Sequence, residues 1–156
     1  MGNISSWCGG ETSSRCVTKT ATGAHKFEVT NYSLLDGMGA GNCVSSNTFS
    51  VGGYDWCINF FPDAYSGCAF ACLCLRGTAK EPGVMVKSTL SFLGSDGKPY
   101  KGTEPVTATR TLPFSHVGIE IFSGWEDRVI VEKCKLRDDD CFTIRCDLTV
   151  MRNTVA

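Results

Sequence analysis

The sequence lacks several features that mark large classes of proteins. No apolar run approaches about 18 residues, the length a membrane-spanning helix needs. The N-terminus has no basic region followed by an apolar stretch, so no secretory signal peptide is predicted. Lys and Arg total 15 against 16 Asp and Glu, and a net charge of -1 gives no general attraction to nucleic acid or anionic lipid. We therefore expect an intracellular protein that does not bind nucleic acid.

Enzyme and metal motifs are also missing. There is no G-x-S-x-G, no H-E-x-x-H and no P-loop, and the glycines of residues 37–41 lack dinucleotide-binding spacing. His25 and His116 are the only histidines, which leaves little acid–base chemistry. No C-x-x-C pair occurs, and the three aspartates of residues 138–140 lack the alternate spacing of a calcium loop. We predict no catalytic residue, no cofactor and no metal.

Cysteine, by contrast, is abundant, with ten in 156 residues. Five of them lie in apolar, strand-like segments, where a free thiol packs as a small hydrophobic group. These are Cys68, Cys72, Cys74, Cys141 and Cys146. A disulfide framework is the alternative, but a chain of this length can form a core without bridges. We expect reduced, mostly buried thiols.

The N-terminal segment differs from the rest of the chain. Residues 1–23 are polar and poor in large apolar groups, so we predict a flexible leader there, a folded domain over residues 24–152 and a tail at residues 153–156. The first six residues fit the pattern for N-myristoylation of Gly2, and Cys8 could take a second acyl chain. Only with that modification would we expect binding to a membrane.

Strand-like segments follow one another from residue 25 to residue 150. They cover residues 25–30, 44–51, 56–61, 68–75, 84–93, 128–133 and 141–150. Between them we predict a Gly-rich loop at residues 36–41, a stop at Pro62, a turn at Asp96-Gly97, a loop or edge segment at residues 99–113 and a charged turn at residues 135–140. No repeated helical pattern is present. About seven or eight short strands with turns between them indicate an all-β antiparallel sandwich.

Three motifs resemble a known family. Residues 24–32 (AHKFEVTNY), residues 44–57 (VSSNTFSVGGYDWC) followed by Phe-Pro-Asp, and residues 139–150 (DDCFTIRCDLTV) are similar to the MATH domain of plant MATH–BTB proteins in order and spacing. The resemblance implies a TRAF-like antiparallel β-sandwich of about eight strands. It also implies protein binding rather than catalysis, in the nucleus and cytoplasm. In that family the MATH domain holds a substrate, and the BTB domain docks on a cullin-3 ubiquitin ligase.

The family's substrates are short segments with a nonpolar residue, a polar residue and then Ser or Thr, which lie in a shallow groove on one sheet. The resemblance therefore implies Ser/Thr-rich segments of regulatory proteins as partners. Because the chain ends at Ala156 without a BTB domain, we expect it not to recruit cullin itself. It would instead bind substrates alone, associate with itself or with MATH–BTB adaptors as a dominant-negative module, or be a degenerate copy.

The family's groove aromatics are largely replaced in this sequence. Two of their positions fall on Cys68 and Ser88, and the family's Trp-Gly-aromatic element is replaced by Gly124, Trp125, Glu126 and Asp127. Trp125 either stands for the family Trp or is an unrelated surface residue. These six residues are the predicted partner-binding site. Aromatic residues dominate binding hot spots, so their loss predicts weaker or altered peptide binding.

Overall fold

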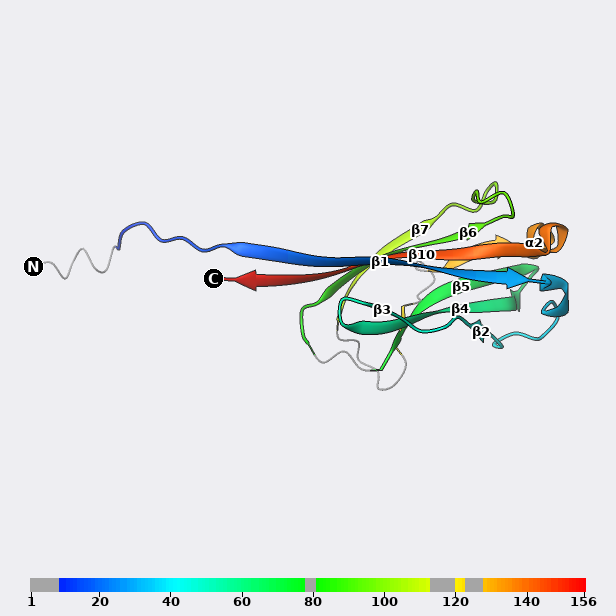
Figure 1. Cartoon of the computed structure of the whole chain (residues 1–156), viewed down its shortest axis with the longest axis horizontal. Coiled ribbons are helices and arrows are strands. Elements are labelled where there is room, and N and C mark those ends of the chain that lie inside the picture. Colours follow the sequence, from blue (N-terminus) through cyan, green and yellow to red (C-terminus); the bar gives the residue numbers. More distant parts are fainter. Residues whose placement is uncertain (1–8, 78–80, 113–119, 123–127) are drawn as a thin grey trace, which may run out of the picture.

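The computed structural model describes residues 9–77, 81–112, 120–122 and 128–156, and forms a sandwich of two sheets (Figure 1). The four-stranded sheet has the order β1 (Cys16–Thr30), β10 (Cys141–Val155), β6 (Met85–Leu93) and β7 (Val106–Thr111). The six-stranded sheet has the order β2 (Val44–Ser45), β4 (Tyr54–Tyr65), β5 (Cys68–Arg76) and β8 (Glu120–Phe122), while β3 (Phe49–Val51) pairs with β4 and β9 (Val129–Glu132) with β5. All pairs are antiparallel, which confirms the predicted all-β sandwich.

The core lies between the two sheets and follows the period-two pattern of the sequence. Alternate residues of β10 from Phe142 to Val150 are buried, as their alternation predicts. Trp56 and Phe60 of β4 are fully buried in this core. The rings of Phe60 and Phe142 pack edge to face with centroids 5.3 Å apart. Such a geometry is favourable for aromatic pairs beyond the area they bury.

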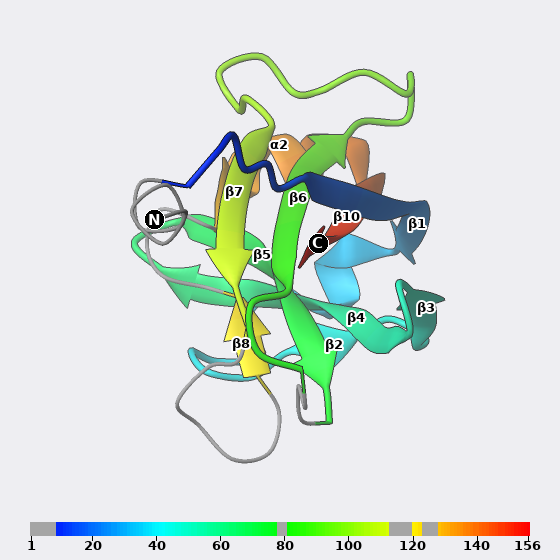
Figure 2. The ribbon, with the colours of Figure 1, turned by 90° about the vertical axis from the view of Figure 1, so that its left-hand side faces the viewer.

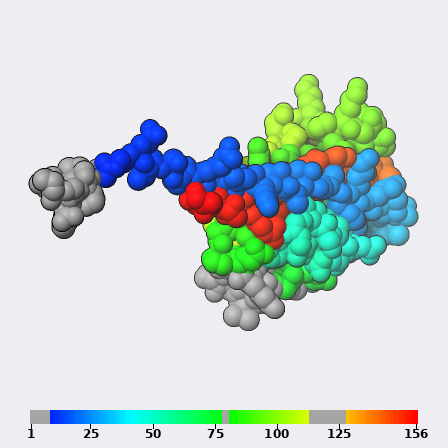
Figure 3. Space-filling model, turned by 60° about the vertical axis from the view of Figure 1, so that its left-hand side comes forward, coloured from blue at the N-terminus to red at the C-terminus, as the bar shows by residue number. Residues whose placement is uncertain are grey.

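Strand β1 begins earlier than the sequence predicts. Residues 16–23 pair in register with residues 148–155 of β10, from Cys16 opposite Val155 to Gly23 opposite Leu148. The predicted flexible leader is therefore wrong for residues 16–23, and the predicted tail is wrong for residues 153–155. This part of the two strands projects beyond the sandwich and buries little (Figures 1 and 3). Its side chains are therefore mostly polar, and the sequence did not predict a strand there.

Two further segments differ from the prediction. Pro62 does not end its strand, since β4 continues to Tyr65 with a register shift between Phe61 and Tyr65, and an irregularity of this kind tolerates a proline. The predicted charged turn at residues 135–140 is mostly helical, in α2 (Lys133–Asp139). Asp140 ends this helix in the left-handed conformation and donates its N–H to the Leu136 carbonyl. Within the described residues, no helix is long and apolar enough to cross a membrane.

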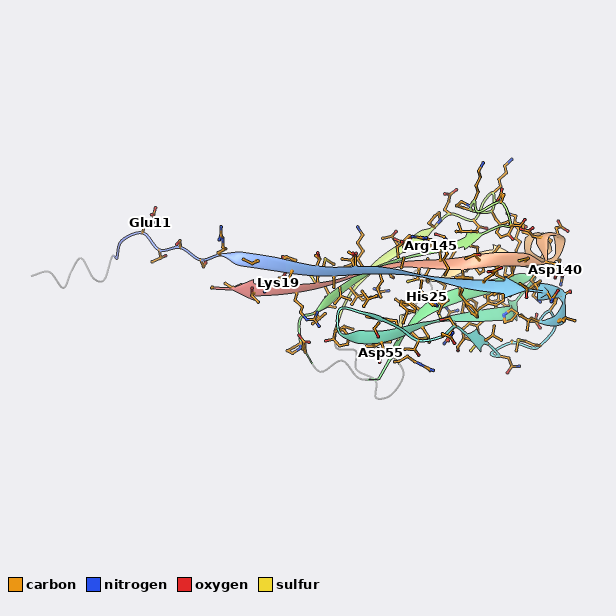
Figure 4. All side chains as sticks on the ribbon, viewed as in Figure 1. Glu11, Lys19, His25, Asp55, Asp140 and Arg145 are labelled. Atoms are coloured by element: carbon orange, nitrogen blue, oxygen red, sulfur yellow. The ribbon has the colours of Figure 1, made fainter. Side chains whose placement is uncertain are left out.

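A group of charges fastens the Gly-rich loop to the helix. Lys133, at the start of α2, is 7% exposed and forms ion pairs with Asp36 and Asp63. Arg137, one turn later, reaches the second oxygen of Asp36 at 2.6 Å. Asp63 also accepts the backbone N–H of Gly39. The loop that follows the 3-10 helix η1 (Tyr32–Leu34) is thereby held at the end of the sandwich where Asp140 is labelled (Figure 4).

Candidate functional site

The structure separates the predicted site residues. Cys68 is the first residue of β5 and is partly exposed on the outward face of the six-stranded sheet. Ser88 lies on β6 in the other sheet, between the core residues Val86 and Leu90, and is only 6% exposed. Ser88 therefore faces the interior of the sandwich, and the two residues do not share a surface. The period-two pattern of β6 puts Ser88 on the same buried face as Val86 and Leu90.

Gly124, Trp125, Glu126 and Asp127 lie outside the described residues, between β8 and β9 in the sequence. Gly2 and Cys8, the predicted lipidation positions, also lie outside them.

Around Cys68 the outward face carries a group of side chains, partly or fully exposed except for the buried Phe70, which we call the β5–β9 patch. It is formed by Phe61, Cys68, Phe70, Arg128, Ile130 and Glu132. The register places Cys68 opposite Glu132 and Phe70 opposite Ile130. Phe61 stacks on Phe70 with ring centroids 4.5 Å apart, and the Arg128 guanidinium lies 4.5 Å from the centre of the Phe70 ring. The patch thus combines rigid aromatic area with one positive and one negative charge.

A row of thiols lies beside this patch on the same outward face. Cys72 and Cys74 of β5 and Cys57 of β4 are buried in a cluster separate from the main core. Cys57 is directly opposite Cys74, and the Asn59 side-chain amide donates to the Cys74 sulfur at 2.9 Å. A hydrogen bond from Cys74 lowers the pKa of the Cys57 thiol to about 7, while its neighbours Cys57 and Cys72 raise the pKa of Cys74.

The row of thiols was not predicted, although the alternating cysteines of the segment CAFACLCL indicate it. Period two puts residues 68, 70, 72 and 74 on one face of a strand, and only the pairing partner was needed to add Cys57. The nine described cysteines are all free. Four of them, Cys57, Cys72, Cys74 and Cys146, are buried, while Cys68 and Cys141 are partly exposed and the other three are exposed. The expectation of mostly buried thiols therefore holds only for these four. No group of three metal-ligating side chains is arranged to hold a metal ion in the part of the chain that the structure describes.

Two of the three consecutive aspartates have structural contacts. Asp139 accepts hydrogen bonds from Ser95 and from the Tyr100 hydroxyl, and Asp140 accepts the backbone N–H of Ser33. Beside them is an open hollow of about 300 Å³ between α2 and the loop that contains Tyr100. These bonds fasten two loops to the end of α2, which accounts for Asp139 and Asp140 without a ligand.

The comparison with known proteins identifies the family. Residues 24–148 match the MATH domain. The chain belongs to the MATH domain family. Among Arabidopsis thaliana proteins, this MATH domain is 30% identical to BTB/POZ and MATH domain-containing protein 4 over 151 residues, which cover 90% of this chain and 32% of that protein. It is 29% identical to protein 3 of the same name over 142 residues, covering 86% of this chain and 35% of that protein.

A shorter segment of the MATH domain is more similar. BTB/POZ and MATH domain-containing protein 5 of Arabidopsis thaliana is 54% identical over 52 residues, which cover 33% of this chain and 13% of that protein. The chain thus spans about a third of the length of the relatives that match most of it. The family is a protein-interaction family, so the MATH domain implies protein partners.

Proposed function

We propose that this MATH domain binds extended, Ser/Thr-rich segments of regulatory proteins, and that it does so as the substrate-recognition part of a cullin-3 ubiquitin ligase system. The observation that carries the proposal is the family match over residues 24–148, together with the names of relatives that join MATH to BTB. The reaction itself would belong to the ligase, and the domain would contribute recognition only.

The β5–β9 patch is our candidate for the peptide site. In the described part of the chain, β9 pairs only with β5. An unpaired strand edge can bind the backbone of an extended ligand. The Phe61 ring, partly exposed and stacked on the buried Phe70, offers rigid apolar area to a nonpolar ligand residue. Arg128 and Glu132 can hydrogen-bond polar and hydroxyl side chains of the same ligand. Cys68 replaces a larger family side chain at the end of this patch, which favours a bulkier or differently shaped ligand residue.

Titration of a fluorescently labelled Ser/Thr-rich peptide, read by fluorescence polarisation, tests the proposal. Phe61→Ala should weaken binding about tenfold or more, because a hot-spot aromatic contributes about 2 kcal/mol. Val155→Ala, which removes an apolar side chain that is 72% exposed at the end of β10 in the other sheet, should leave affinity unchanged. Circular dichroism must show both variants folded. Equal affinities for wild type and Phe61→Ala would exclude the patch, and no binding by wild type would overturn the peptide proposal.

A second candidate function is association with another copy or with a MATH–BTB adaptor. Its supporting observation is β1, an edge strand of 15 residues whose first part projects beyond the sandwich (Figure 3). Long exposed edges readily pair with other strands. Analytical ultracentrifugation separates the two functions, since a chain that stays monomeric at high concentration would exclude self-association.

A further inference from the structure

The row of thiols on the outward face contains a directly opposed cysteine pair. Cys57 on β4 and Cys74 on β5 are partners in the antiparallel register, with both side chains on the same face. Directly opposed residues have Cβ atoms about 4.5–5.5 Å apart, and a disulfide requires about 3.5–4.5 Å. A bond between the two sulfurs therefore needs only a small closing movement of two strands that are already hydrogen-bonded.

Side-chain contacts hold these two thiols together. Asn59 bridges the pair by donating to the Cys74 sulfur at 2.9 Å and accepting from Cys57 at 3.7 Å. Cys72 is the competing neighbour, but it lies two residues from Cys74 on the same strand. Such residues are about 6.6 Å apart, at the upper limit for a disulfide. The geometry favours the pair across the strands.

We propose that Cys57 and Cys74 form a reversible dithiol–disulfide pair that hydrogen peroxide oxidises. This modification site is independent of the proposed peptide binding, so either idea can fail without the other. It would link β4 to β5 on the face that carries the β5–β9 patch.

The reaction balances with peroxide as the oxidant. The Cys57 thiolate attacks one peroxide oxygen, the O–O bond breaks, and Cys57 becomes a sulfenic acid while the released hydroxide takes up the thiol proton as water. The Cys74 sulfur then attacks the Cys57 sulfur, an S–S bond forms, the S–O bond breaks, and a second water leaves with the Cys74 proton. The lowered pKa of Cys57 and the raised pKa of Cys74 fit these roles of attacking and resolving thiol.

The surroundings of the pair favour a small oxidant. Cys57 and Cys74 are both 0% exposed, but they lie on the outer side of a sheet and not between the sheets. Among the described residues, the partly exposed Phe61, Ala64 and Ile130 pack against the cluster and form a layer over it. We expect peroxide to pass this layer more readily than glutathione disulfide or a bulky alkylating reagent. The exposed Cys16, Cys43 and Cys134 should show the opposite preference.

The test uses the full chain, reduced, freed of reductant and treated with hydrogen peroxide at low protein concentration. After alkylation of the remaining thiols, chymotryptic mapping should find the Cys57 and Cys74 peptides linked, with a loss of about 2 Da for one disulfide, and dithiothreitol should reverse the link. Cys57→Ser and Cys74→Ser should each lose this product, whereas Cys134→Ser should keep it.

Two results would overturn the proposal. One is that Cys57 and Cys74 are both recovered as alkylated thiols after peroxide has oxidised the exposed cysteines. The other is that the intramolecular bridge joins Cys72 and Cys74. If a serine variant fails to fold, the mapping of the wild-type chain alone still decides between these outcomes.

Discussion

Gly52 lies so close to Val150 that a Cβ atom on the glycine would be 2.5 Å from the Cβ of the valine. Gly52 is in the turn between β3 and β4, and Val150 is on β10, so this contact joins the edge of one sheet to the middle of the other. Gly52 also has a φ of 66°, in the left-handed region. Space and backbone conformation both require glycine here.

Gly52→Ala should therefore lower the free energy of unfolding by about 2–4 kcal/mol, as the sum of overpacking and left-handed strain. Gly67→Ala is the matched control, because Gly67 has a φ of 75° but no atom within 4 Å of an added Cβ. It should lose only about 1–2 kcal/mol. Urea unfolding measures both, and equal losses would show that the contact with Val150 does not matter.

The hydroxyl of Tyr32 ties the start of the Gly-rich loop to β4. Tyr32 is fully buried, and its hydroxyl donates to the Pro62 carbonyl at 2.8 Å. Tyr32→Phe leaves that carbonyl without its donor, so we expect a loss of about 1–3 kcal/mol in urea unfolding. Tyr54→Phe is the control, since the Tyr54 hydroxyl makes only a 3.4 Å contact with exposed Glu81. A loss in the control as large as that in Tyr32→Phe would contradict the account.

Acid should weaken the attachment of the loop to α2. The hydrogen bond from Arg137 holds the pKa of Asp36 below its usual value of 3.8, and that from Lys133 does the same for Asp63. Because the pKa values are lower in the folded state, the stabilisation is present above the unfolded value and is lost as pH falls below it.

The urea midpoint should accordingly fall between about pH 5 and pH 2. Lys133→Met should flatten part of this pH dependence, because it removes the partner of Asp63. Arg145→Met, which breaks the more exposed pair with Asp147, should change the slope little. An unchanged slope in Lys133→Met would contradict the role given to this network.

Truncation tests the position at which the fold begins. Removing residues 1–14 deletes exposed or undescribed chain, and the urea midpoint should stay the same. Removing residues 1–22 deletes the partners of Thr149 to Val155 in β10, and should cost roughly 1–4 kcal/mol at a few tenths for each lost cross-strand pair. If both truncations were equally stable, the projecting part of β1 would contribute nothing to the fold.

The sequence predicted the segments whose pattern is strong and local. The alternation in β10 predicted a strand with one buried face, and the continuous apolar run of β5 predicted a buried strand, which the structure buries on both faces. The early start of β1 was missed because Thr18, Lys19 and Thr20 bury almost nothing, and the register with β10 is a property of two distant segments. The helix at Lys133 was missed because its charges have partners 70 to 101 residues away.

The candidate site was harder to predict for the same reason. The family resemblance grouped Cys68 with Ser88, whereas the period-two pattern of β6 puts Ser88 on the face that packs into the core between the sheets. The opposition of Cys57 and Cys74, and the stacking of Phe61 on Phe70, depend on the register between β4 and β5. The register between two strands is set by the fold as a whole, and no local sequence pattern predicts it.

The central claim is that the β5–β9 patch of this MATH domain binds an extended Ser/Thr-rich segment. Amide chemical-shift mapping of the isotopically labelled chain during titration with an unlabelled peptide tests it most directly. The account predicts that the shifts concentrate on β5 and β9 around Cys68, Phe70 and Ile130, and that the outer residues of β6 and β7 do not move. Shifts confined to the four-stranded sheet, or to the edge of β1, would contradict it.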